Sequence, residues 1–350
     1  MLEILKKLVN KPKAHKYFNE GEMLRSRGHM ESALICYERV LEADPEFYMA
    51  YEKAGLCLNE LGRYEEAVKY LDRAIALNPC SSEPYNNKGY AFMNLGYYSA
   101  ALTYIDESLK KNPRLNEAYC NRSLVLIYME RFSEAVECLD RYIGFSPKDP
   151  FAFHLKAHAL YCLNEPDLAI ESANIAISIA PMFFEVQYLK GRILYYKADY
   201  DLALESFTKA TTLNPKNGDV YSWKADTLYE LERYEEAILY YNQAVSLNSR
   251  QSVQALLNKG YSLDMMGRHE ESLKSYLKYL EEGGGDPHVY YALGISYYCT
   301  KKYEDALANY KKYIELCPGE HGAVLKAADL LYDLSRFDEA LDLLSNPVYI

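Results

Sequence analysis

The sequence predicts an all-α fold of stacked antiparallel helix pairs, and three repeating features of the 350-residue chain predict it. Small residues recur every 34 positions, with one step of 35, at Ala33, Ala67, Ala101, Ala135, Ala169, Ala203, Ala237, Ser272, Ala306 and Ala340. Prolines keep the same interval, at Pro45, Pro79, Pro113, Pro147, Pro181 and Pro215. Apolar residues between these markers have helical spacing, so each period is one structural unit made of helices.

Each period contains two helices, as residues 48–81 illustrate. Apolar side chains at helical spacing precede and follow Gly62, where a residue without Cβ can take a positive φ and turn the chain. Gly55 and Ala67 are small enough to let the two helices cross closely. Pro79 ends the second helix because proline cannot continue the hydrogen-bond ladder. One such pair cannot bury its apolar face alone, so neighbouring pairs are expected to stack.

This pattern resembles the tetratricopeptide repeat family, on the evidence of Tyr51, Gly55, Tyr64, Ala67 and Pro79 and their counterparts along the chain. Ten units are expected, starting at residues 14, 48, 82, 116, 150, 184, 218, 253, 287 and 321. They form one array over 14–350, preceded by a short capping segment at 1–13. The resemblance implies a right-handed superhelical solenoid that binds peptides or proteins, mostly on its concave face.

The charge of the chain argues against nucleic acid as a partner. The formal net charge is −11, while residues 1–30 hold seven Lys and Arg against three Glu. An acidic body does not suit the phosphate backbone, which needs clustered basic residues. Leu2, Leu5 and Leu8 fit one helical face, so the basic start is interpreted as a cap on the first unit.

Other features of the composition favour a cytoplasmic protein without catalytic activity. No apolar run is long enough to cross a membrane, and the start lacks the pattern of a secretion signal. The eight cysteines are scattered without C-x-x-C spacing, as in a reduced protein. The sequence has no nucleophile elbow, phosphate loop or glycine-rich dinucleotide turn, so we expect no enzyme activity and no cofactor.

The residues expected to bind a partner lie on the first helix of each unit. Places two, five, nine, twelve and thirteen of a unit form one helical stripe, which faces the groove. The candidate partner-binding residues are Asn86, Asn87, Tyr90, Asn121, His154, His158, Tyr188, Arg192, Tyr195, Tyr196, Trp223, Asp226, Tyr229, Tyr261, Asp264, Tyr291 and Tyr298. Among them, Asn87 and Asn121 occupy part of an asparagine ladder that could clamp a peptide backbone.

Tyrosine and aspartate concentrate in the groove over residues 184–333. Many of the other tyrosines occupy regular places that are interpreted as structural core positions. One set is Tyr37, Tyr241, Tyr276 and Tyr310, and another is Tyr64, Tyr98, Tyr200, Tyr234 and Tyr303. A tyrosine offers a large apolar ring, a polar tip and little side-chain entropy to lose on binding. We therefore expect a noncatalytic adaptor or scaffold whose second half binds a protein segment with basic and apolar residues. The alternative is an empty, solvated groove.

Two alternative functions remain open. His154, His158 and Cys162 follow one another at intervals of four residues, a spacing that can share a metal ion, as in a metal-binding or enzyme-regulatory subunit. No polar capping helix is evident at the carboxyl end, where Leu344 is soon followed by Pro347–Ile350. An apolar end of this kind can pair with a second copy and form a homo-oligomer.

The glycines at 283–285 interrupt the regular spacing between two units. Three consecutive glycines give the backbone unusual freedom. The segment is either a slightly longer loop within the solenoid or a hinge that lets the last two units move.

Overall fold

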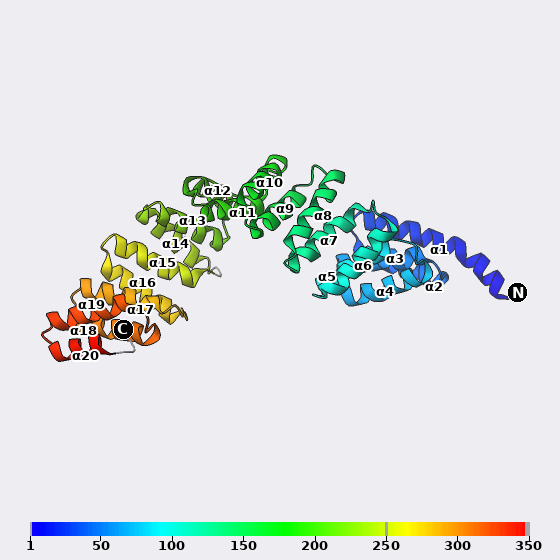
Figure 1. Ribbon diagram of the computed structural model, residues 1–350. Coiled ribbons are helices and arrows are strands. Elements are labelled where there is room, and N and C mark those ends of the chain that lie inside the picture. The colour runs from blue at the N-terminus through cyan, green and yellow to red at the C-terminus, as the bar shows by residue number, and fades with distance from the viewer. Residues whose placement is uncertain (1, 249–250, 347–350) are drawn as a thin grey trace. The chain divides into compact units, whose positions relative to one another are not determined.

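The computed structural model describes residues 2–248 and 251–346, with side chains from residue 12 onward. Within these ranges it contains twenty α-helices and no strand (Figure 1). The helices fall into two compact units, Met1–Pro181 with the first ten and Met182–Ile350 with the last ten. The division falls at the boundary between the fifth and sixth predicted repeats, and each unit is described by itself.

The first unit contains five helix pairs. Their helices are α1 (Leu2–Ser26), α2 (Met30–Ala43), α3 (Tyr48–Glu60), α4 (Tyr64–Leu77), α5 (Glu83–Asn94), α6 (Tyr98–Lys111), α7 (Asn116–Tyr128), α8 (Phe132–Phe145), α9 (Pro150–Cys162) and α10 (Pro166–Ile179). The predicted boundary at residue 14 falls inside α1, so the described part of the predicted capping segment, residues 2–13, continues directly into the first repeat. The face formed by Leu2, Leu5 and Leu8 lies outside the described side chains, and its capping role stays a prediction.

The second unit also contains five helix pairs. Their helices are α11 (Phe184–Tyr196), α12 (Tyr200–Leu213), α13 (Gly218–Glu230), α14 (Tyr234–Ser246), α15 (Ser252–Met265), α16 (His269–Glu281), α17 (His288–Cys299), α18 (Tyr303–Leu316), α19 (His321–Asp333) and α20 (Phe337–Ser345). From α3 onward, the first helix of every pair begins within one residue of its predicted start. The all-α fold of successive helix pairs is therefore confirmed.

The turn inside every pair uses a left-handed residue, as the sequence predicted for Gly62, whose φ is +73°. The equivalent residues are Gly28, Gly62, Gly96, Glu130, Asn164, Ala198, Glu232, Gly267, Lys301 and Ser335. Only some of these are glycine, although a side chain in this conformation carries a steric cost. The repeat geometry therefore imposes the turn even where the local sequence does not favour it.

Close packing within a pair depends on the small residue of the first helix. A Cβ added to Gly55 would lie 2.6 Å from Leu71 on the second helix, one turn beyond the Ala67 that the sequence singled out. In the second unit, a Cβ on Gly260 would lie 2.2 Å from the ring of Tyr276. The predicted close crossing is confirmed, and the residue that fills the crossing changes from repeat to repeat.

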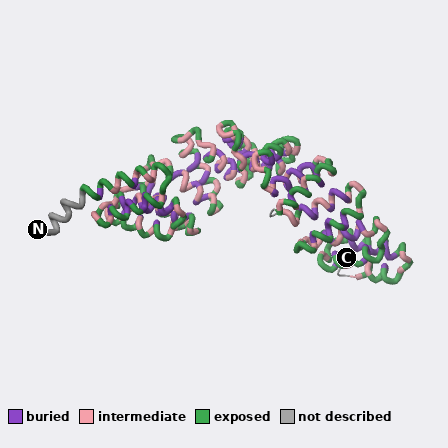
Figure 2. The backbone as a smooth tube through the Cα atoms, turned by 180° about the vertical axis from the view of Figure 1, so that it is seen from behind, coloured by how far each residue is buried: buried purple, intermediate pink, exposed green. Residues whose placement is uncertain are grey.

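Each first helix also packs against neighbouring repeats, so the stack has no single centre. For example, α13 contacts α14 of its own pair and the first helices α11 and α15 on either side. Figure 2 shows buried residues recurring from pair to pair within each unit. This arrangement brings the first helices of consecutive repeats side by side, and it places their groove residues next to one another.

The predicted core tyrosines fall into two groups. Tyr37, Tyr241, Tyr276 and Tyr310 are buried, as expected for a core place. The tyrosine at the start of many second helices is less enclosed, and Tyr303 is exposed. The assignment of this second place to the core is therefore only partly correct.

The glycine segment at 283–285 is a loop fastened to the preceding helix. Gly283 has a φ of +86° and closes the end of α16. The hydroxyl of the buried Tyr279 accepts a hydrogen bond of 2.8 Å from the backbone N–H of Asp286. These contacts favour the interpretation as a loop within the solenoid over that of a hinge.

Candidate binding surface on the first helices

The second unit has a hollow on its first-helix face, with a volume of about 410 Å³. It is lined by Tyr195, Tyr196, Trp223, Asp226, Tyr229, Glu230, Tyr241, Asn258 and Tyr261. Six of these belong to the predicted partner-binding set: Tyr195, Tyr196, Trp223, Asp226, Tyr229 and Tyr261. The helices α11, α13 and α15 bring them together because equivalent places on consecutive first helices face the same side.

Ring-to-ring contacts fix the aromatic wall of this hollow. The ring centroids of Tyr195 and Trp223 are 5.3 Å apart, and those of Tyr196 and Trp223 are 5.7 Å apart, both edge to face. Tyr229 packs in the same manner against Tyr234, at 5.4 Å. Burial raises the pKa of the Tyr195 phenol, so this hydroxyl is neutral at physiological pH. A wall held in place before binding loses little conformational entropy when a ligand arrives.

A carboxylate with two fixed donors lies beneath the rings. The Asp226 Oδ1 atom accepts hydrogen bonds from the Tyr241 hydroxyl at 2.7 Å and from the Asn258 side-chain amide at 2.9 Å. Burial raises the pKa of Asp226, and these two hydrogen bonds partly offset that rise. Glu230 is exposed at the rim. The lining therefore combines aromatic rings with two acidic residues.

Replacing Asp226 with Asn is expected to stabilise the second unit at neutral pH. A raised folded-state pKa means that the folded chain binds the proton more readily, so stability is lost as pH rises from the unfolded pKa through the folded one. Asn removes the buried charge and keeps an oxygen for Tyr241 and Asn258. We expect the thermal midpoint at pH 7 to rise by about 2 °C, measured by calorimetry.

The difference from wild type should vanish below about pH 3, where the carboxyl is protonated in both the folded and the unfolded state. A variant less stable than wild type at pH 7 would show that the ionised carboxylate is net stabilising.

Two further predicted residues lie beside the hollow rather than in its lining. The Arg192 guanidinium lies 5.5 Å from the centroid of Trp223 and 5.8 Å from that of Tyr188. Tyr188 also stacks on Phe184 at 6.0 Å. Both residues therefore support the aromatic wall from its α11 side.

Asp264 was predicted to face a partner, but it is the centre of an internal network. Its carboxylate accepts hydrogen bonds from the Tyr276 hydroxyl at 2.7 Å, from Ser272 at 2.5 Å and from Ser296 at 2.8 Å. The His269 Nδ1 atom also lies 3.0 Å from it. These contacts join α15, α16 and α17, which gives Asp264 a structural role.

The last two predicted tyrosines are separate from the hollow. Tyr291 packs against Tyr310 and Tyr313, with centroid distances of 5.8 and 5.5 Å. Tyr298 is 44% exposed and lies 5.7 Å from Tyr303. The aromatic stripe predicted along 184–333 is therefore concentrated at α11–α15 and thinner beyond.

The first unit has its own hollow on the first-helix face, also about 410 Å³. Four predicted residues line it, namely Asn86, Asn87, Tyr90 and Asn121. The Asn121 amide donates to the Asn86 side-chain oxygen at 3.0 Å, and the Asn59 amide donates to the Asn87 carbonyl at 2.8 Å. Of the two expected ladder residues, Asn121 therefore uses its side-chain amide to bond one repeat to the next, whereas Asn87 contributes its backbone carbonyl to such a bond.

The histidine pair does not form a metal-binding cluster. His154 and His158 lie on α9, and the Cys162 Sγ atom is 4.0 Å from the His158 Nε2 atom. Among the residues that the structure describes, no group of three His, Cys, Asp or Glu side chains could hold a metal ion. The geometry gives the metal alternative no support.

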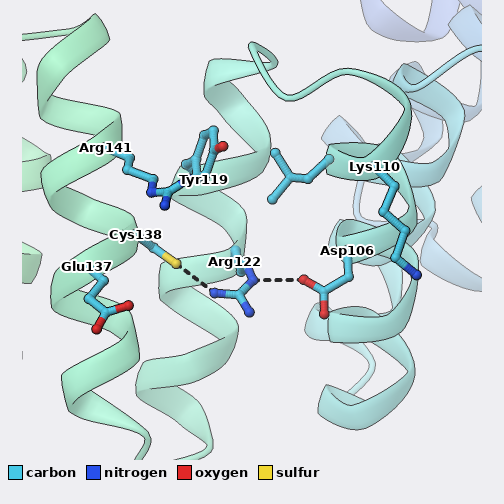
Figure 3. A pocket seen from close by; sticks show the side chains of 8 residues that line it. Asp106, Lys110, Tyr119, Arg122, Glu137, Cys138 and Arg141 are labelled. Atoms are coloured by element: carbon cyan, nitrogen blue, oxygen red, sulfur yellow. Dashed lines mark hydrogen bonds and ion pairs between the residues drawn. The ribbon is translucent and has the colours of Figure 1, made fainter.

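A third hollow, of about 480 Å³, lies between α6, α7 and α8 and was not predicted from the sequence (Figure 3). Its central Arg122 donates to the Asp106 carboxylate at 2.8 Å and to the Cys138 sulfur at 2.9 Å. Arg141 lies over the Tyr119 ring at 5.9 Å. Arg122 and Arg141 of this hollow are therefore engaged within the chain.

Two other expectations concern the ends and the membrane. On α19 and α20, Tyr332, Phe337 and Leu341 are more than half exposed. Residues 347–350 lie outside the described residues, so self-association through this end stays a prediction. No helix in the described ranges combines the length and apolarity needed to cross a membrane.

The fold and its repeating groove define a solenoid of helix pairs, and comparison identifies the family. Models of the tetratricopeptide repeat match residues 18–81, 82–114, 117–149, 188–251, 224–287 and 287–320. The chain belongs to the tetratricopeptide repeat family, which confirms the resemblance seen in the sequence. Proteins of this family are generally noncatalytic adaptors, and membership supports a protein-interaction scaffold.

The similar solved structures have low sequence identity to this chain, and the first two described here share its fold. PilF of Pseudomonas aeruginosa is 19% identical with a TM-score of 0.55, over 62% of this chain and 99% of PilF. A tetratricopeptide repeat protein of Parabacteroides merdae is 18% identical with a TM-score of 0.51, over 69% of this chain and 95% of its own. MamA of Desulfovibrio magneticus is 26% identical with a TM-score of 0.46, over 48% of this chain and 95% of the MamA chain. No curated protein sequence matches the chain.

Proposed function

We propose that the chain is a noncatalytic adaptor that binds a segment of a partner protein on the first-helix face of its second unit. The observation that carries this proposal is the aromatic hollow, where Tyr195, Trp223 and Tyr229 converge from two helices. Rigid aromatic side chains in a concave site supply much of the binding energy of protein interfaces. Their arrangement supports recognition of a side chain that enters the hollow.

The chemistry of the hollow favours a segment with basic and apolar residues. Asp226 and Glu230 provide negative charge, and the rings provide apolar surface and cation–π contacts. The first-helix hollow of the first unit is lined mainly by amide and carboxyl groups, together with Arg25 and the two tyrosines Tyr90 and Tyr142. We therefore assign the principal binding site to the second unit.

The test compares the partners captured from the native cell extract by wild type and by two double variants. The groove variant carries Tyr195→Ala and Tyr229→Ala. The control variant carries Leu202→Ala and Leu239→Ala, which remove exposed apolar side chains from the second helices α12 and α14. Truncation of a central aromatic typically costs 2 kcal/mol or more, so affinity should fall about 30-fold or more in the groove variant.

We expect partners to be lost from the groove variant alone, as measured by quantitative mass spectrometry and then by titration of the purified partner. Both variants must retain the helical circular dichroism of wild type. Identical partner sets for all three proteins would refute recognition in this hollow.

A further inference from the structure

The charge at the aromatic hollow calls for a cationic ligand. Its described lining holds two acidic side chains, Asp226 and Glu230, and includes no Lys or Arg. An anion would be repelled here, and a purely apolar occupant would remove water from Asp226 without replacing it by a donor. A positively charged group can make cation–π contacts with the rings and ion pairs with the carboxylates.

The hydrogen-bonding pattern of Asp226 limits which kinds of cation could bind in the hollow. Both hydrogen bonds from Tyr241 and Asn258 end on Oδ1, and the described residues provide no hydrogen-bond donor to Oδ2. Oδ2 is therefore the acceptor that remains for a ligand. A quaternary ammonium has no N–H to offer it, whereas a guanidinium or a primary ammonium does.

The rings distinguish between the two remaining cations. A lysine ammonium is a compact, strongly hydrated charge, and it loses much of its hydration on entering an aromatic site. A guanidinium is planar and weakly hydrated, stacks on aromatic faces and presents several N–H groups in one plane. Tyr195, Trp223 and Tyr229 line the hollow with aromatic rings, and Asp226 with Glu230 provides the acceptors.

The chain itself shows a guanidinium beside the same tryptophan. Arg192 lies with its Cζ atom 5.5 Å from the Trp223 centroid and 5.8 Å from that of Tyr188. Arg192 is not among the residues that line the hollow. The surroundings of Trp223 therefore already accommodate a cation–π contact with arginine.

We propose that this hollow is a specificity pocket for one arginine side chain of the partner segment, with the guanidinium against the aromatic wall and its N–H groups directed to Asp226 and Glu230. The inference rests on the proposed function and names the chemical group that the proposed binding site recognises. It assigns the pocket a preference for arginine over lysine and over any neutral side chain of similar shape.

The chain contains a single tryptophan, Trp223, so its fluorescence reports on this pocket alone. The probe is N-acetyl-arginine amide, titrated into the full chain. N-acetyl-citrulline amide has nearly the same shape without the charge, and N-acetyl-lysine amide has the charge without the planar group. For one side chain we expect a dissociation constant on the order of 1 mM, with citrulline at least about tenfold weaker and lysine several-fold weaker.

Variants that each remove one negative charge distinguish binding by the carboxylates of the hollow from general attraction of a cation to an acidic chain. Asp226→Asn should weaken arginine binding about tenfold or more, and Glu230→Gln should weaken it less because Glu230 is exposed. Glu235→Gln removes one charge from the first turn of α14, outside the lining, and should leave the affinity unchanged. Circular dichroism checks that all three variants keep the wild-type fold.

Three results would overturn the inference. They are citrulline binding as tightly as arginine, lysine binding more tightly than arginine, and no saturable signal up to about 50 mM in either tryptophan fluorescence or saturation-transfer NMR. The proposed function is tested separately by partner capture. One combination of results would refute the arginine pocket and leave the adaptor function intact. In it, the partner no longer binds the variant that carries Tyr195→Ala and Tyr229→Ala, but replacing the partner's own arginines does not change its affinity for wild type.

Discussion

Asp264→Ala is expected to unfold the stack locally around α15, α16 and α17. The substitution deletes the acceptor shared by the buried residues Tyr276, Ser272 and Ser296. The Tyr276 hydroxyl would lose its partner, while Ser272 would keep its bonds to the His269 carbonyl and to Ser296. A buried network broken on one side loses more than a single exposed hydrogen bond, because each stranded donor pays its own desolvation cost. We expect a loss of about 3 kcal/mol or more in the free energy of opening this region.

Hydrogen exchange measures this effect where it occurs. A repeat array need not unfold in a single step, so one global midpoint would average over repeats. Amide protection should fall in peptides from α15–α17 and change little in those from the first unit. Asp329→Ala provides the control, because Asp329 is an exposed carboxylate on the first-helix stripe of α19 and its loss should cost less than about 0.5 kcal/mol. Equal effects of the two substitutions would contradict the structural role of Asp264.

The same substitution at two helical glycines is expected to have opposite effects. A Cβ on Gly260 would lie 2.2 Å from the Tyr276 ring, which is fully buried and hydrogen-bonded to Asp264 and so cannot move aside. A Cβ on Gly144, in α8, would meet no atom within 4 Å. Gly260→Ala should therefore destabilise its repeat by about 1–3 kcal/mol through overpacking. Gly144→Ala should stabilise α8 by up to about 1 kcal/mol, since alanine favours a helix more than glycine does.

Both variants can be measured by urea denaturation, followed by circular dichroism, alongside exchange in the affected helices. The difference in sign is the informative result, because it separates the packing role of the first-helix glycine from general helix propensity. Stabilisation by Gly260→Ala would mean that the crossing between α15 and α16 is looser than the structure places it.

Most of the fold could be predicted because it repeats. A 34-residue interval seen across the chain predicts a helix, a turn and a helix in every unit. Where the local sequence signal of one unit is weak, the pattern of the other units still supports the prediction. Ala198 and Lys301 illustrate this, since neither residue suggests a left-handed turn by itself, yet both adopt one. The division of the array between Pro181 and Met182 could not be predicted, because that boundary carries the same proline marker as the others.

The lining of the hollow in the second unit was predicted only in part, because helical phase gives the direction of a side chain and not the residues that it contacts. It correctly grouped Tyr195, Asp226 and Tyr229 on one face. Helical phase could not show that Asp264, on the same stripe, accepts hydrogen bonds from hydroxyl groups of α16 and α17. Nor did it include Asn258, which comes from a neighbouring place of its helix and bonds across to Asp226.

The two first-helix hollows differ in the residues that line them. In the first unit, Asn121 donates a hydrogen bond to Asn86, and this bond joins two neighbouring repeats across the groove. In the second unit, aromatic residues such as Tyr195 and Tyr196 occupy the wall and leave acidic groups beneath them. A repeat scaffold thus carries different surface chemistry on an unchanged backbone, which is why the fold alone does not define a ligand.

The most direct test of binding in the aromatic hollow is the emission of Trp223 during titration with the purified partner segment. The account predicts a saturable change in emission with the same dissociation constant as calorimetry, weakened about 30-fold or more by Tyr195→Ala with Tyr229→Ala and unaffected by Leu202→Ala with Leu239→Ala. A partner that binds in calorimetry with Trp223 emission unchanged, and equally well to all three proteins, would contradict it and place recognition elsewhere on the chain.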